Sequence, residues 1–368
     1  MTTPPPAVHV GSPDGRSYGV HFEPLAEAPR HLRGVGLDGR VLVITDETVG
    51  PLHLGALTDA LAADGRGVEA LAVPAGEGSK SLRQYGEVAD WALARGIDRQ
   101  TPVLALGGGV VGDLAGFAAA TLLRGLPLVH LPTTTISQVD SAIGGKTGVN
   151  TPAGKNLLGA FYAPRVVLAD PATLATLPDR DFRSGLAEAV KHALIRDADL
   201  AARIDRQWDA LAGRDPETVA ELVRDAAAIK AAVVEADERE AGDRALLNFG
   251  HTFGHALEHQ AGYGTLTHGE AVAIGMRAAL HLSSSLAAGA VADDLLPDFD
   301  RADRLVTRLA PAAPDLDRDA LVDAMGTDKK RTADGLRFVV LEAVGQARLA
   351  SDVPAEMVRA AWAFALER

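Results

Sequence analysis

Short apolar segments alternate with helix-like segments through the first part of the chain. Strands are predicted at 41–45, 68–74, 102–106 and 127–131, and helices at 52–64, 82–95 and 114–123. Strands that alternate with helices pair in parallel, and the helices cover both faces of the resulting sheet. This alternation therefore predicts an α/β fold for the first part of the chain.

The pattern changes to helices after about Pro178. Leu222, Ala226, Ile229 and Val233 form one apolar stripe at helical spacing. The other predicted elements are helices at 270–286 and 354–366 and a lone strand at 336–341. The second part of the chain is therefore predicted to be helical.

The length of 368 residues is large for a single core, so two domains are expected. We predict a Rossmann-like α/β domain over 1–178 and an all-α domain over 179–368. The hydrophobic share of 47% and the charged share of 23% are ordinary for a globular protein.

The overall composition limits the cellular compartments and the kinds of binding partner that fit this chain. The absence of cysteine excludes disulfides and thiolate metal ligands and fits a reducing compartment. Met1–Ala7 lacks the basic region and apolar core of a secretory signal, and no run reaches the roughly 18 apolar residues of a membrane span. The net charge of −13 disfavours nucleic acid or an anionic membrane as the main partner. We expect a cytoplasmic protein.

A glycine-rich turn follows the strand predicted at 102–106. Gly107, Gly109 and Gly112 match G-x-G-x-x-G, a pattern that lets backbone approach a pyrophosphate at a helix N-terminus. The pattern alone fits a merely tight turn equally well. Because it lies about 60 residues after the first strand, Asp46 at the end of that strand is the better candidate to hold ribose hydroxyls. The alternative role for Asp46 is a helix N-cap.

A segment rich in glycine, lysine and small polar residues lies between Pro132 and Phe161. It contains Lys146, Lys155 and Asn156. Lysines in such a setting can place ammonium groups against a phosphate or a polyol. The alternative interpretation is a solvated loop.

Glu188, His251 and His268 predict a metal site. One carboxylate and two imidazoles suit a catalytic divalent metal such as zinc, because water or substrate completes the shell. His255 lies four residues after His251 and shares its helix face. The pair is either two metal ligands, or one ligand and one acid–base group.

Two lysines lie on predicted helices. Lys191 shares a face with Glu188, which is also the pattern of a surface ion pair. Lys230 is flanked by alanines and valines, so it is predicted to point inward, although snorkelling explains the same pattern.

Taken together, these segments resemble the 3-dehydroquinate synthases, a branch of the sugar phosphate cyclase family. The motifs that carry the resemblance are Gly107–Asp113, Gln138–Thr147, Gly154–Phe161 and Asn248–Ala256. The resemblance covers nearly the whole chain. It implies an NAD-binding α/β domain over 1–178 and a helical metal-binding domain over 179–368.

The resemblance also implies a role for individual residues. Zn²⁺ or Co²⁺ would be held by Glu188, His251 and His268. NAD would contact Asp46, Glu77, Lys80, Gly107, Gly108, Gly109, Val110, Asp113, Thr133, Thr134, Lys146, Lys155, Thr173 and Thr176. The substrate would be surrounded by Asp140, Lys146, Lys155, Asn156, Lys191, Lys230, Arg244, Asn248 and His255.

Three further expectations come from the resemblance. Arg124 looks like the arginine that reaches the phosphate in the neighbouring subunit, which implies a homodimer. Either Lys329 or Lys330 joins the substrate site. The stretch from 289 to 317 and the Pro-rich N-terminus follow no family pattern.

The implied activity is that of a carbon–oxygen lyase of the shikimate pathway, which leads to aromatic amino acids. It converts 3-deoxy-D-arabino-heptulosonate 7-phosphate to 3-dehydroquinate and phosphate. NAD oxidises the substrate transiently, phosphate is eliminated, the ketone is reduced again, and an intramolecular aldol reaction closes the ring. His255 is the candidate for proton transfer.

Three rival interpretations accompany this one. They are a sister cyclase such as an aminodehydroquinate, epi-valiolone or deoxy-inosose synthase, a metal-dependent NAD alcohol dehydrogenase, and a non-catalytic scaffold. Arg244 argues against cyclases whose sugars lack a carboxylate, because a guanidinium pairs bidentately with one. It does not separate dehydroquinate from aminodehydroquinate synthase.

Overall fold

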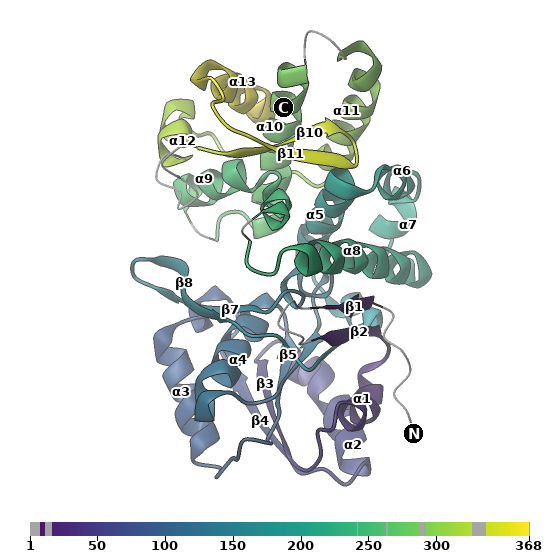
Figure 1. Ribbon diagram of the computed structural model, residues 1–368, viewed down its shortest axis with the longest axis vertical. Helices are drawn as coiled ribbons and strands as arrows, with labels where there is room; N and C mark the ends of the chain where they lie inside the picture. The colour runs from purple at the N-terminus through teal and green to yellow at the C-terminus, as the bar shows by residue number, and fades with distance from the viewer. Residues whose placement is uncertain are drawn as a thin grey trace. The chain divides into compact units, whose positions relative to one another are not determined.

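The chain forms two compact units in a computed structural model that describes residues 8–11, 17–240, 242–262, 264–287, 292–325 and 336–367 (Figure 1). The first unit comprises Met1–Pro178 and Val219–Arg239, and the second comprises Asp179–Thr218 and Glu240–Arg368.

A seven-stranded sheet forms the centre of the first unit, in the order β1-β2-β9-β6-β5-β3-β4. The strands are β1 Val8–Val10, β2 Tyr18–Phe22, β3 Val41–Asp46, β4 Val68–Val73, β5 Val103–Gly107, β6 Leu128–Pro132 and β9 Val166–Ala169. All neighbours pair in parallel except β1 and β2. The four predicted strands are confirmed as β3 to β6. Strands β1, β2 and β9 have only three to five residues each, too few to show a clear periodicity.

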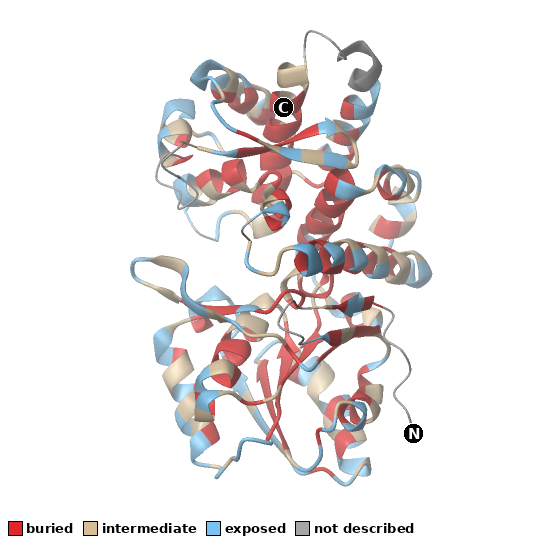
Figure 2. Cartoon of the chain, viewed as in Figure 1, coloured by how far each residue is buried: buried red, intermediate tan, exposed pale blue. Residues whose placement is uncertain are grey.

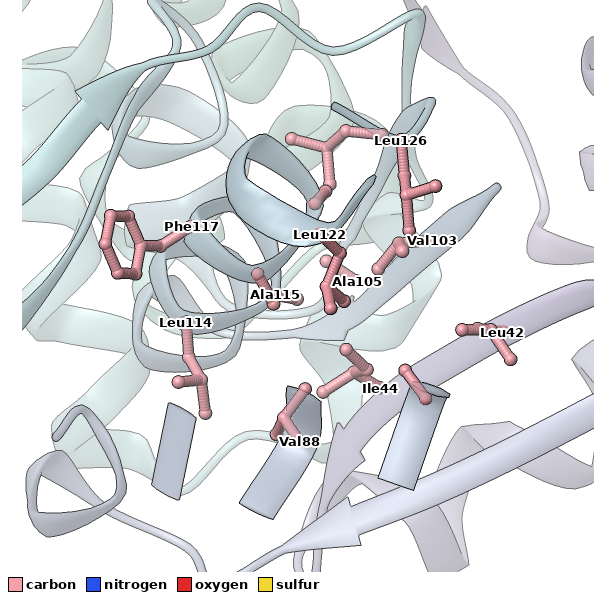
Figure 3. Close-up of a cluster of buried hydrophobic side chains, with 14 of the residues drawn as sticks. Leu42, Ile44, Val88, Val103, Ala105, Leu114, Ala115, Phe117, Leu122 and Leu126 are labelled. Carbon is pink, nitrogen blue, oxygen red and sulfur yellow. The ribbon is translucent and has the colours of Figure 1, made fainter. Parts of the chain in front are cut away.

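Adjacent residues of β3 enter different cores. Leu42 and Ile44 pack in one cluster with Leu114 of helix α4, Gly109–Thr121, as Figure 3 shows. Val41 and Val43 pack in a second cluster with Leu57 of helix α2, Gly55–Ala63. Because neighbouring strand residues point to opposite faces, both faces of the sheet are buried.

Three helices of the first unit were predicted and differ mainly at their ends: α2 Gly55–Ala63, α3 Leu82–Leu93 and α4 Gly109–Thr121. Helix α1, Ala28–Gly34, was not predicted. Helix α4 begins five residues before its predicted start at 114, because the glycine turn itself forms the first helical turn.

Helix α8, Pro216–Ala236, accounts for the one difference from the predicted division at 178. Most of it groups with the first unit, whereas the sequence assigned it to the second domain. The physical reason is its apolar face. Ala227, Ala231 and Val234 pack against Val20 of β2 and Val167 of β9.

The second unit is largely helical, as predicted. Its helices are α5 Asp179–Arg196, α6 Ala198–Arg206, α7 Trp208–Ala212, α9 His251–Ala261, α10 His268–Ala287, α11 Ala292–Thr307, α12 Arg318–Met325 and α13 Ala355–Leu366. The prediction of an all-α domain needs one correction. The predicted lone strand is β10, Phe338–Ala343, and it pairs with β11, Gln346–Ala350, in an antiparallel hairpin. Gly345 turns this hairpin with φ +88°, a conformation that favours glycine.

Helix α10 lies at the centre of the second unit. It contacts α5, α9, α11 and α13, and most of its residues are buried (Figure 2). Although α10 has 20 residues, neither it nor any other described helix is long and apolar enough to cross a membrane.

Candidate active site

The predicted NAD-binding residues of the first unit gather at the carboxyl ends of neighbouring strands. Asp46 ends β3, Gly107 ends β5 and Thr133 follows β6. The chain runs from β3 outward to β4, but from β5 to β6 on the other side. Ligands of open parallel sheets bind where the strand order reverses in this way.

The glycine turn leaves the backbone at the start of α4 without side chains, so that a ligand can approach it. A Cβ atom at Gly108 would lie 2.9 Å from Cγ2 of Thr134, and one at Gly109 would lie 3.0 Å from Oγ of Ser141. The first N–H groups of a helix have no partner within the helix and favour negative charge. A cradle that side chains would fill, at a helix N-terminus, fits the pyrophosphate of NAD.

Asp46 stabilises the turn before the helical segment Gly50–Leu54, whose N-cap is Val49 and not Asp46. Its Oδ1 accepts hydrogen bonds from the N–H groups of Thr48 (2.8 Å) and Val49 (2.9 Å). Both bonds use the same carboxylate oxygen. Contact with a ribose therefore stays a prediction, alongside an observed structural role.

Lys80 ties the turn that contains Glu77 to helix α4. Its buried ammonium forms an ion pair with Oδ2 of Asp113. Burial raises the pKa of the Asp113 carboxyl above its usual value, although the Lys80 ammonium opposes that rise. Oε1 of Glu77 accepts a hydrogen bond from Nδ2 of Asn150 (2.7 Å). Asn150 also donates its N–H to the carbonyl oxygen of Lys80 (2.8 Å), so Glu77, Lys80 and Asp113 are parts of one polar network.

Gln138 was not predicted as a site residue, yet it organises the predicted threonine contacts. It is fully buried, and its Nε2 donates to the carbonyl oxygens of Pro132 (3.0 Å) and Asp170 (2.8 Å). The same atom lies 3.2 Å from Oγ1 of Thr173. Oγ1 of Thr176 donates to the carbonyl of Thr173 (2.8 Å). The sequence signal that could have identified Gln138 is an amide side chain among small polar residues just after a predicted strand.

Lys230 points inward, as predicted. It is 7% exposed, and its Nζ lies 2.7 Å from Oδ1 of Asp140. Snorkelling to solvent is therefore not its role. The pair joins α8 to the turn after β6, and it brings together two residues of the predicted substrate site.

The predicted phosphate partners lie on a hairpin formed by β7, Lys146–Thr151, and β8, Gly154–Phe161. Lys146 is opposite Phe161, at the open end. Asn156 donates its N–H to Oδ1 of Asn150 (3.0 Å), near the turn. Four residue steps along β7, roughly 13 Å of backbone, lie between Lys146 and Asn150. The hairpin therefore sets Lys146 apart from the adjacent Lys155 and Asn156, and their shared contact with a phosphate stays a prediction.

Three helices of the second unit bring the predicted metal ligands together. Glu188 of α5 is 1% exposed, and its Oε1 lies 3.6 Å from Nε2 of His251 and 3.5 Å from Nε2 of His268. The three donor atoms all lie within 4.8 Å of one another. One carboxylate oxygen and two imidazole nitrogens that face one point fit a divalent metal with open positions.

Glycines allow the close helix packing that builds this group. A Cβ atom at Gly269 would lie 1.9 Å from the carbonyl oxygen of Ser184 on α5. A Cβ atom at Gly275 would lie 2.1 Å from the carbonyl oxygen of Gly250, just before α9. Any larger residue at 269 or 275 would push α10 away. These contacts were not foreseen from the sequence.

Lys191 forms a buried ion pair with Oε2 of Glu188. Their side chains are 2% and 1% exposed, so this is not the surface pair that the sequence left open. Burial, followed by the Lys191 ammonium, lowers the pKa of His251 well below its usual value. Burial also lowers the pKa of His268, but hydrogen bonds with Glu188 and Glu258 outweigh it and raise the pKa to about 9.

His255 lies beside the metal group. Its ring centroid is 5.6 Å from that of His251 and 6.3 Å from that of His268. Among the described residues, the three-ligand group contains His251 but not His255. Proton transfer by His255 stays a prediction.

The remaining predicted residues of the second unit lie on the 3-10 helix Asp243–Asn248. Arg244 is 1% exposed. Nδ2 of Asn248 donates to Oε1 of Glu240 (3.0 Å), a residue that the sequence did not single out. Lys329 and Lys330 lie outside the described residues.

Arg124 lies on a strained turn of the first unit. It is exposed and has φ +67°, and Leu123 before it has φ +49°. Both values are uncommon for residues with a side chain.

Comparison with known proteins gives the family. Residues 70–184 match the family model for the 3-dehydroquinate synthase N-terminal domain, and residues 185–331 match the C-terminal one. The chain belongs to the 3-dehydroquinate synthase family. A 3-dehydroquinate synthase of Salinibacter ruber is 53% identical over 355 residues, which are 96% of this chain and 95% of that relative. The family resemblance of the motifs is confirmed.

Solved structures of sister enzymes share the fold of this 3-dehydroquinate synthase family member. A 2-epi-5-epi-valiolone synthase of Streptomyces hygroscopicus subsp. jinggangensis, with NAD⁺ and Zn²⁺ bound, has a TM-score of 0.84 and 31% identity, covering 95% of this chain and 96% of that one. A 2-deoxy-scyllo-inosose synthase with carbaglucose-6-phosphate, NAD⁺ and Co²⁺ has a TM-score of 0.85 and 26% identity, covering 96% and 98%. The predicted α/β-plus-helical fold is confirmed.

His268→Ala should bind no metal and keep its fold, because only Glu188 and His251 would remain as ligands. Metal content after loading with Zn²⁺, measured by atomic emission, checks this, with circular dichroism for the fold. The matched control is His259→Ala, an exposed histidine of α9, which should keep its metal. Full occupancy in His268→Ala would exclude that residue as a ligand.

Proposed function

We propose that this chain is a 3-dehydroquinate synthase that uses NAD and Zn²⁺ or Co²⁺ to convert 3-deoxy-D-arabino-heptulosonate 7-phosphate to 3-dehydroquinate and phosphate. The observation that carries the proposal is the group of Glu188, His251 and His268, which fits a metal centre in a chain of this family. Identity of 53% to a 3-dehydroquinate synthase, against 31% and 26% to sister synthases, supports the choice of substrate.

The two cofactors supply the chemistry that side chains lack. Bound NAD supplies reversible acceptance of hydride, and a bound divalent metal supplies a Lewis acid for adjacent substrate oxygens. In the proposal, the bare turn at Gly108 and Gly109 holds the pyrophosphate. Glu188, His251 and His268 hold the metal.

The protein's own groups bind the substrate and move its protons. His255 transfers a proton at a substrate hydroxyl, directly or through a water. Lys146, Lys155 and Asn156 hold the phosphate that leaves. The buried Lys230 ammonium is held by Asp140, whose side chain is 22% exposed, so the position of Lys230 is set before the substrate binds.

Arg244 supports a substrate that has a carboxylate. Its guanidinium is buried and can pair bidentately with a carboxylate group. Carbaglucose-6-phosphate, which is bound in the 2-deoxy-scyllo-inosose synthase, has no carboxylate. The heptulosonate phosphate has one, so we propose that Arg244 binds it.

A homodimer and a cytoplasmic location are parts of the proposal. The exposed Arg124 would reach the phosphate in a second copy. Strand β8 exposes Leu157, Leu158 and Phe161 by 45%, 38% and 52%, an apolar surface that a second copy would cover. The absence of cysteine supports a reducing compartment. The net charge of −13 favours neither nucleic acid nor an anionic membrane as a partner.

The purified protein with NAD and Zn²⁺ should release phosphate from the heptulosonate phosphate without net growth of NADH absorbance, because NAD is regenerated in each turnover. Phosphate and NADH are measured together. Sedoheptulose 7-phosphate and the amino analogue of the heptulosonate serve as comparison substrates and should react more slowly. NADH formed in proportion to product would indicate a dehydrogenase, and faster turnover of a comparison substrate would indicate a sister synthase.

Arg244→Leu should lower kcat/KM for the heptulosonate phosphate roughly 30-fold or more, because loss of one side of a charge-assisted pair costs about 2–5 kcal/mol. Metal content and NAD affinity should stay near those of the wild type. Arg359→Leu, an exposed arginine of α13 paired with Asp319, is the matched control. Wild-type kcat/KM in Arg244→Leu would contradict the role of Arg244 in substrate binding.

Mixing inactive Arg124→Ala and Lys146→Ala subunits should restore some activity if Arg124 serves the neighbouring site. The mixed dimer then has one site with both lesions and one site with neither. A mixture of Lys146→Ala and Lys230→Ala is the control, because both lysines are assigned to their own subunit's site and every site stays damaged. No recovery after verified subunit exchange would argue against a shared site.

A further inference from the structure

We propose that Glu258 is a positioning residue of the metal centre, which accepts the Nδ1–H of His268 and thereby turns the Nε2 lone pair toward the metal. The inference rests on the proposed function, because it requires Glu188, His251 and His268 to hold a metal.

His268 lies between two carboxylates. Its Nε2 is 3.5 Å from Oε1 of Glu188, and its Nδ1 is 3.5 Å from Oε2 of Glu258. A neutral imidazole carries its proton on only one ring nitrogen, and the group that faces one nitrogen selects the state of the other. When a metal occupies the side of the ring that faces Glu188, the carboxylate of Glu258 keeps the proton on Nδ1 and leaves the Nε2 lone pair for the metal.

His251 is held in the same way by a different acceptor. Its Nδ1 lies 3.3 Å from the carbonyl oxygen of Phe249, and its Nε2 lies 3.6 Å from Oε1 of Glu188. A backbone carbonyl only accepts hydrogen bonds, so the proton belongs on Nδ1. Both imidazoles thus direct Nε2 at the same carboxylate oxygen and Nδ1 at another oxygen. Glu258 does for His268 what Phe249 does for His251.

The exposure of the three ligands explains why His268 needs such a partner. The side chains of Glu188 and His251 are 1% and 12% exposed, so neighbouring atoms restrict them. The side chain of His268 is 35% exposed and lies at the very start of α10. Fewer packing contacts leave its ring freer to rotate, and a fixed acceptor removes that freedom.

Glu258 is well placed to be that acceptor. It lies seven residues after His251 and three after His255 on α9, so it shares the helix face that carries both histidines. Its side chain is 12% exposed, which strengthens its interaction with the ring relative to one in water. Carboxylates behind metal-binding histidines orient the ring and raise its basicity.

The test compares Glu258→Ala and Glu258→Gln with the wild type. Glu258→Ala should weaken Co²⁺ affinity about 10- to 100-fold, measured by competition with a chelator. It should also change the visible absorption of bound Co²⁺, which reports ligand geometry. Glu258→Gln keeps an oxygen acceptor without the charge, so it should recover much of the affinity and the wild-type spectrum. Circular dichroism verifies the fold of each variant.

Three results would overturn the positioning role. The first is a wild-type Kd and Co²⁺ spectrum in Glu258→Ala. The second is a Glu258→Gln variant as weak as Glu258→Ala, and the third is equal weakening by Glu342→Ala. Glu342 is the matched control, an exposed acid of β10 paired with Arg348.

His268→Ala separates this inference from the metal centre itself. If His268→Ala loses Co²⁺ while Glu258→Ala keeps it, the positioning role fails and the metal centre stands. If His268→Ala binds Co²⁺ like the wild type, the metal centre fails. In the His268→Ala background, a further Glu258→Ala change should have no additional effect on residual affinity, because its partner is already gone.

Discussion

The second unit is built around one buried carboxylate. Glu188 has one oxygen paired with the Lys191 ammonium, while its other oxygen faces Nε2 of both His251 and His268. A buried carboxylate is costly unless charges and hydrogen bonds compensate for lost water. The arrangement around Glu188 therefore requires a cation on one side and polar groups on the other. A divalent metal between Glu188 and the two imidazoles would satisfy that second requirement.

Glycine makes the sites of both units possible by the same physical means. In the first unit, Gly108 and Gly109 keep side chains away from the start of α4, so that a ligand can touch the backbone. In the second unit, Gly269 and Gly275 let α10 approach the backbones of its neighbours. In each place a single methyl group would occupy space that the site needs. The lack of a side chain at these glycines is therefore as important for the two sites as the side chains that line them.

Sequence patterns predicted the parts of the site that depend on local spacing. The turn at 107–112 follows from a glycine pattern after a predicted strand, and the inward position of Lys230 follows from its apolar neighbours. The grouping of Glu188, His251 and His268 follows from chemistry and family motifs. Residues that act through distant contacts were missed. Gln138 bridges the ends of β6 and β9, and Glu258 faces a histidine on another helix. Neither forms a recognisable motif with its neighbours in the chain.

The sequence by itself determined the class of fold, because buried strands and helices impose their periods on the order of apolar residues. It also determined the family, because the motifs hold many specified residues in order. Only the tertiary structure decided which unit holds α8, how the hairpin separates Lys146 from Asn156, and which oxygen each histidine faces. These features depend on which surfaces meet after the chain has folded. Contacts between residues far apart in the chain produce no periodic pattern in the sequence.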